Sequence, residues 1–277
     1  MEASALRRPA ALPGWVQVGV VAVLLGVAAA GWAVTDERMA GMDAGPGTEL
    51  GGLGWFAVVW TTMMAAMMLP SITPMVLAYA RIRRGGRVGG APPMVGATPL
   101  FVAGYVATWG AAGLLAYVLV EGVRALDPGF LAWDEGGPYV AGGVVFAAGA
   151  YQLTALKDTS LRRCRAPLAF VSERWRAGVA GALRMGVEHG GACIGSSWAM
   201  MAALFALGVM SIGWMVLVAA LIAAEKLVPR RTVATRAIAV LLAAVGIAVA
   251  FAPGDVPGLT IPGSSEAASA MGEMGMK

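Results

Sequence analysis

The longest uncharged stretch of the chain limits the folds that are open to it. Residues 190–224 contain no Asp, Glu, Lys or Arg, and about 20 apolar residues let one helix cross the hydrocarbon core of a bilayer. The composition agrees, because 58% of the residues are hydrophobic and only 13% are charged, against about 45–50% and about 25% in soluble domains. A soluble enzyme, a disordered chain, a coiled coil and a secreted disulfide scaffold are therefore excluded.

Seven apolar segments predict an all-α fold, a polytopic membrane bundle of about seven transmembrane helices. The segments are residues 15–34, 53–80, 94–120, 138–156, 190–208, 212–224 and 237–251. The first segment follows Arg7 and Arg8, so cleavage of it as a signal peptide is an alternative that leaves six spans. Its apolar core is longer than the core of about 7–15 residues that is typical of signal peptides.

The basic residues predict how the bundle is oriented. With the N-terminus inside and the C-terminus outside, most of the 20 Lys and Arg residues fall in inner segments, as cytoplasmic loops require. The net charge of +4 is therefore a signal of orientation in the inner (plasma) membrane and not a sign of nucleic-acid binding. We expect a single helical domain over residues 1–252, an inner amphipathic segment at 157–188 and a flexible Gly, Ser and Met tail at 253–277.

Methionines on the second span are the first candidate metal ligands. Two pairs of them are spaced i,i+4, so each pair lies on one face of a helix, and Pro70 and Pro74 follow. Thioethers are soft ligands that suit Cu(I), although methionine also fills gaps between packed helices. The four candidates are Met63, Met64, Met67 and Met68.

The fifth span places other soft ligands at helical spacing. His189, the only histidine, and Cys193, one of two cysteines, lie one turn apart on a stripe that continues to Met201, with Met200 beside it. Imidazole, thiolate and thioether together make a plausible Cu(I) site. The alternative is a packing seam, because Gly190, Gly191 and Gly195 would let another helix approach closely.

Three further features leave alternatives open. Cys164, in the basic inner segment, is either a second ligand or an interfacial thiol. Glu225 and Lys226 are either interfacial anchors, paired with each other or with the inner basic segment, or functional groups. The outer segments hold short methionine spacings that suit transient Cu(I) capture or arise from composition alone. These methionines are Met39, Met42, Met271, Met274 and Met276.

Several of these motifs together resemble one family. They are the strings Trp-Thr-Thr-Met-Met-Ala-Ala-Met-Met-Leu-Pro at 60–70, Tyr-Gln-Leu-Thr at 151–154, Lys157, Cys-Arg-Ala-Pro at 164–167, His189-Gly190 and Glu225-Lys226. The chain is similar in them to the predicted metal-binding integral membrane proteins of DUF2182, which include a copper chaperone needed by a polyphenol oxidase. The resemblance implies copper handling. Ser160, Ser196 and Ser197 stand where members of that family often carry cysteines, which implies weaker Cu(I) binding here.

The leading hypothesis is a membrane-bound Cu(I) metallochaperone that delivers copper to a client protein and is not an enzyme. The expected ligands are Met63, Met64, Met67, Met68, His189, Cys193, Met200 and Met201. One alternative is a transporter for a small solute or metal ion, since proline-broken helices line transport sites. Another is a structural or assembly subunit of a membrane complex that has lost metal binding.

Overall fold

The computed structural model describes residues 12–39, 45–46, 49–84, 96–126 and 129–261, and within them it contains helices and no strand. This confirms the all-α fold class. The helices are α1 (Gly14–Met39), α2 (Leu53–Arg84), α3 (Ala97–Ala125), α4 (Gly137–Tyr151), α5 (Ala155–Arg165), α6 (Pro167–Glu173), α7 (Gly178–Leu207), α8 (Ile212–Leu227) and α9 (Arg231–Phe251), with short 3-10 turns at Gly129–Leu131 and Pro253–Asp255.

Five of the helices are long and apolar enough to cross a membrane, namely α1, α2, α3, α7 and α9. The pair α4 and α5 qualifies as a sixth when it is taken as one span bent by 64°. Helix α8 has 16 residues, which is short for a span of about 20 residues. These helices are compatible with a multi-pass membrane protein, and the count of seven spans and the orientation stay predictions.

The inner segment 157–188 differs from the expected surface segment in one respect. Helices α5 and α6 occupy its first part, but α7 begins at Gly178 and runs without a break into the fifth apolar segment. Arg184 and Glu188 lie on this one helix as an i,i+4 ion pair with a distance of 3.2 Å. The charged residues therefore continue the helix for several turns beyond its apolar part, which places His189 and Cys193 in the middle of α7.

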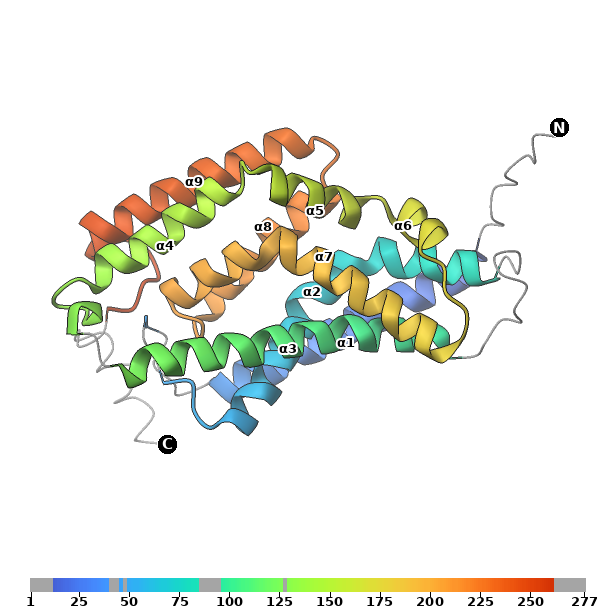
Figure 1. Ribbon diagram of the computed structural model, residues 1–277, viewed down its shortest axis with the longest axis horizontal. Coiled ribbons are helices and arrows are strands. Elements are labelled where there is room, and N and C mark those ends of the chain that lie inside the picture. Colours follow the sequence, from blue (N-terminus) through green and yellow to red (C-terminus); the bar gives the residue numbers. More distant parts are fainter. Residues whose placement is uncertain (1–11, 40–44, 47–48, 85–95, 127–128, 262–277) are drawn as a thin grey trace.

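Helix α7 runs through the middle of the molecule, and α4 and α9 lie side by side along one flank (Figure 1). Helix α7 contacts α3, α4, α5 and α8, so most of its faces are buried. Large apolar side chains on the outer faces are exposed, among them Leu115, Val240 and Phe251. Exposed apolar surface of this kind is expected where a helix faces lipid.

Glycines let the central helices touch through their backbones. A Cβ atom on Gly104 of α3 would lie 2.3 Å from the carbonyl oxygen of Leu183, and one on Gly186 of α7 would lie 2.1 Å from the carbonyl oxygen of Phe101. Small residues allow this spacing between helices in a membrane. The contact fixes α7 against α3, which carries Tyr105.

The sequence predicts that another helix packs closely against three glycines of α7. This prediction is confirmed at Gly190 and Gly195 and is wrong at Gly191. A Cβ atom would meet Thr108 at 2.8 Å on Gly190 and Ser160 Oγ at 2.7 Å on Gly195, whereas Gly191 faces open space. The error has a simple cause. Gly191 directly follows Gly190, so it lies about 100° further around the helix, on a face that α3 does not cover.

We expect Gly186→Ala to destabilise the bundle. Its new methyl group would overlap the α3 backbone, which cannot move aside like a flexible side chain, and overpacking typically costs about 1–3 kcal/mol. Gly191→Ala is the matched control, because the same change on the same helix meets no atom within 4 Å. The unfolding temperatures of the two variants in detergent check the prediction, and equal values for both would contradict it.

Candidate metal centre

The thiol of Cys193 is the point where three helices meet. Cys193 lies in the middle of α7 and is fully buried. Lys226 Nζ, from the end of α8, donates a hydrogen bond to its sulfur at 2.9 Å, and the hydroxyl of Tyr105 on α3 lies 3.1 Å from it. A buried sulfur with a cation and a hydroxyl in contact is a suitable environment for a thiolate.

Cys164 reaches the same place from α5. Its thiol interacts with that of Cys193 and lies 3.9 Å from the hydroxyl of Ser196. The turn of 64° between α4 and α5 lays α5 back against α7, and Gly195 leaves room for Ser160 of α5. Both thiols therefore lie in one cluster, and a ligand role for Cys164 stays a prediction. Both cysteines are free.

His189 lies one helical turn before Cys193 and contributes an unsatisfied nitrogen. The side chain is 2% exposed and is surrounded by the rings of Phe101, Tyr105 and Phe170. Its Nδ1 atom has no hydrogen-bond partner. Buried polar atoms are normally paired, and a neutral imidazole nitrogen is a common metal ligand. The Nδ1 atom of His189 is therefore open to a further partner.

The six candidate methionines are all buried, and they belong to one apolar cluster with Cys193. Their exposed fractions run from 0% for Met68 and Met200 to 5% for Met201. The α2 methionines border the thiols indirectly, because Lys226 Nζ donates both to Cys193 and, at 3.3 Å, to Ser71 of α2.

Within the described ranges, His, Cys, Asp and Glu side chains do not form a preformed metal-binding group. In the part of the chain that the structure describes, no three of them converge. The hydroxyls of Ser196 and Ser197 both donate to the backbone carbonyl of Cys193, at 2.8 and 2.7 Å, so they are engaged by the helix itself. The expected ligand His189 is therefore not brought together with the two thiols into one metal-binding group among the described residues.

A buried ion pair holds this arrangement in place. Lys157 Nζ on α5 lies 2.8 and 2.7 Å from the two carboxylate oxygens of Glu225 on α8, and the side chains are 1% and 2% exposed. Gln152 Oε1 accepts a further hydrogen bond from the same ammonium. Because Glu225 precedes Lys226, the pair fixes the end of α8 at which Lys226 turns toward Cys193.

The sequence reasoning found part of this set. The pairing of Glu225 with the inner basic segment, one of its alternatives, is confirmed through Lys157. The contact of Lys226 with Cys193 was missed, although Lys157, Glu225 and Lys226 were singled out as motif residues. Tyr105 carried no signal, since a lone tyrosine in an apolar segment is ordinary. Met39 is buried at the end of α1, whereas Met42, Met271, Met274 and Met276 lie outside the described residues.

We expect Lys157→Met to be strongly destabilising, because it leaves the Glu225 carboxylate buried without its cation. Breaking a buried pair on one side costs about 3–5 kcal/mol, whereas replacing both partners by apolar residues is often close to neutral. Lys157→Met with Glu225→Leu should therefore recover much of the loss. Arg162→Gln is the control, because its exposed pair with Asp158 contributes about 0–1 kcal/mol. Unfolding temperatures check this, and a double variant less stable than Lys157→Met would refute it.

Comparisons with known proteins place this centre in a family. No curated protein and no solved structure matches the chain. The family model described as PpoB2 copper chaperone matches residues 57–249. The match runs from α2 into α9 and takes in both cysteines, His189, the candidate methionines and the Lys157–Glu225 pair. It confirms the copper-chaperone part of the resemblance seen in the sequence. The chain belongs to the PpoB2 copper chaperone family.

Proposed function

We propose that this protein is a membrane-bound metallochaperone of the inner (plasma) membrane that binds Cu(I) inside its helix bundle and passes it to a client protein. One observation carries the proposal: the thiols of Cys164 and Cys193, from two helices, interact with each other inside the bundle. Copper is the cargo, so the role needs no catalytic group. Membership of a copper chaperone family supports it.

The proposed ligands divide into a fixed pair and a choice of third donors. The two thiolates would bind the ion first, because sulfur is the softest donor in the cluster. His189 is one candidate for the third donor. The other candidates are the thioethers of Met63, Met64, Met67, Met68, Met200 and Met201. An exchangeable third donor suits a chaperone, since copper must leave as well as enter.

Lys226 supplies a positive charge at the sulfur of Cys193 when copper is absent. A buried thiolate without a counter-ion is costly, and the Lys226 ammonium at 2.9 Å supplies one to Cys193. A Cu(I) ion carries the same single positive charge, so it would replace the ammonium at the sulfur. Ser71 already accepts a hydrogen bond from Lys226 and offers the displaced ammonium a partner. When both thiols bind Cu(I), Cys164 releases its proton to solvent and the two thiolates with the ion carry one net negative charge. The displaced Lys226 ammonium at Ser71 balances that charge, as it balances the Cys193 thiolate alone when copper is absent.

We expect Cys193→Ala to abolish tight copper binding and Cys164→Ala to weaken it at least about tenfold, a loss of roughly 1.4 kcal/mol or more. Met67→Leu tests the thioethers, and Met210→Leu is its matched control because Met210 is equally buried but lies outside the candidate set. The copper content of each variant is measured after anaerobic Cu(I) loading. Its affinity for Cu(I) is measured in competition with a chromophoric chelator. Wild type holding no more copper than Cys193→Ala would rule the site out.

The same preparations separate the alternatives. Transfer of copper from the loaded protein to a copper-free acceptor enzyme, without flux of copper into proteoliposomes, supports delivery. Protein-dependent flux into proteoliposomes would instead favour a transporter. Stable co-purification with a large partner irrespective of copper would favour an assembly subunit.

We expect Ser196→Cys to tighten Cu(I) binding by about tenfold or more, since a third thiolate is a far better Cu(I) ligand than a hydroxyl. Ser196 Oγ lies 3.9 Å from Cys164 Sγ, so the new sulfur would join the existing cluster. Ser211→Cys, before the first turn of α8, controls for an added thiol elsewhere. Competition for Cu(I) against the same chelator gives the affinities, and an unchanged value for Ser196→Cys would contradict the placement of the site.

A further inference from the structure

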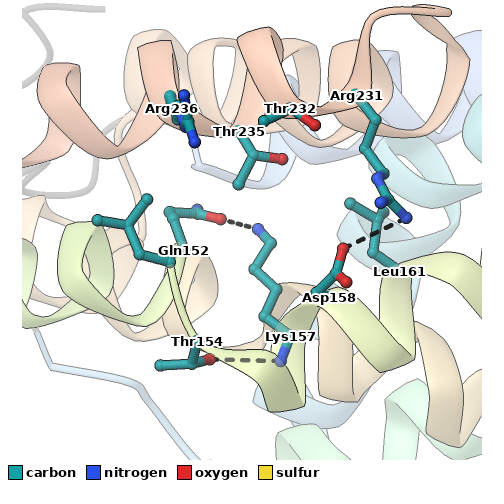
Figure 2. A pocket seen from close by; sticks show the side chains of 10 residues that line it. Gln152, Thr154, Lys157, Asp158, Leu161, Arg231, Thr232, Thr235 and Arg236 are labelled. Atoms are coloured by element: carbon teal, nitrogen blue, oxygen red, sulfur yellow. Dashed lines mark hydrogen bonds and ion pairs between the residues drawn. The ribbon is translucent and has the colours of Figure 1, made fainter.

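A polar cavity lies where α4 turns into α5, against the first turns of α9 (Figure 2). Its volume is about 490 Å³. The residues that matter to its chemistry are Gln152, Lys157, Asp158, Arg231, Thr235 and Arg236. Neither cysteine and none of the candidate methionines lines it, so it is separate from the proposed copper centre.

Two buried donors at this cavity have no partner. Gln152 is 2% exposed, and its Oε1 accepts from the Lys157 ammonium (Figure 2). An ammonium only donates hydrogen bonds, so the orientation of the amide is fixed and its NH₂ group is left over. That nitrogen and the buried hydroxyl of Thr235 have no hydrogen-bond partner. Because an unsatisfied buried donor is costly, both groups point to an acceptor that a ligand brings.

The charges around the cavity favour an anionic acceptor. Arg231, Arg236 and Lys157 line it together with a single carboxylate, that of Asp158. Asp158 is already engaged by Arg231 at 3.3 Å and by Arg162, and Lys157 is neutralised by Glu225. Arg236 has no ion pair among the described residues, so an uncompensated guanidinium remains.

The start of α9 adds to the same preference. No side chain caps this helix, and Arg231 and Thr232 of its first turn line the cavity. The first amides of a helix lack partners within the helix, and together with the helix dipole they favour an anion. The Arg231 amide already donates to Pro229 O at 3.0 Å, so the donors that line the cavity are the hydroxyl, amide and guanidinium side chains.

We propose that this cavity binds a phosphate group. Guanidinium groups bind phosphate oxygens through paired hydrogen bonds, and the Gln152 amide and Thr235 hydroxyl would supply two more donors. The cavity lies at the Arg231 end of α9, a candidate membrane span, and thus at the level where lipid headgroups are found. The phosphate belongs either to an anionic lipid headgroup or to a free phosphate in solution.

The test uses the full chain in nanodiscs of phosphatidylcholine, with and without phosphatidylglycerol. Binding of inorganic phosphate is followed by broadening of its phosphorus NMR signal, and binding of phosphatidylglycerol by the rise in unfolding temperature. The test variant combines Thr235→Val with Arg236→Gln. The matched control is Arg163→Gln, which removes an exposed arginine of α5 that does not line the cavity.

We expect the test variant to bind the phosphate probe at least about tenfold more weakly than wild type, because it loses one ionised donor and one neutral donor. We expect Arg163→Gln to bind the probe like wild type. Phosphate binding in phosphatidylcholine discs identifies a free phosphate as the ligand, and stabilisation by phosphatidylglycerol alone identifies a lipid headgroup. The proposal is overturned if neither probe binds, or if the two variants lose binding equally. Copper content plays no part in these readings, so failure here leaves the copper centre untouched.

Discussion

The buried pair of Lys157 and Glu225 is the interaction on which the rest of the structure depends. It joins α5 to α8, and its two charges are nearly excluded from solvent. Charges inside a membrane protein are kept only when they are paired. The pair therefore fixes the bend between α4 and α5 and the end of α8 together, and with them the positions of Cys164 and Lys226.

Two different sites share this pair without sharing a ligand. On one side Glu225 leads directly to Lys226, whose ammonium contacts Cys193. On the other side the Lys157 ammonium donates a hydrogen bond to the side-chain oxygen of Gln152, and the amide nitrogen of Gln152 has no partner at the polar cavity. In the middle of the bundle α3 and α7 pack backbone to backbone, because at Gly104 and Gly186 they leave no room for a methyl group. Electrostatic pairing thus sets the end of the bundle that holds Lys157 and Glu225, and close packing sets its middle.

Cys193 and its surroundings explain how a chain with two cysteines can belong to a copper chaperone family. Ser160, Ser196 and Ser197, the positions that the resemblance matches to cysteines, all lie near the two thiols' helices: Ser160 faces Gly195, Ser196 lies 3.9 Å from Cys164, and Ser197 donates to the Cys193 carbonyl. With hydroxyls at these three positions, the proposed site would need His189 or thioethers to complete the coordination of Cu(I).

The sequence by itself determined the helices and the local stripes on them. Charge-free runs and the 3.6-residue period predict α1, α2, α3, α7 and α9, and the same period puts His189 and Cys193 one turn apart. Only the tertiary structure decided that Cys164 reaches Cys193, that Lys226 faces a thiol, and that Gly191 packs against nothing. Helical periodicity fixes neighbours within about one turn, whereas contacts between distant segments depend on the direction of a bend and on which faces meet. Both of those follow from pairing and packing over the whole bundle.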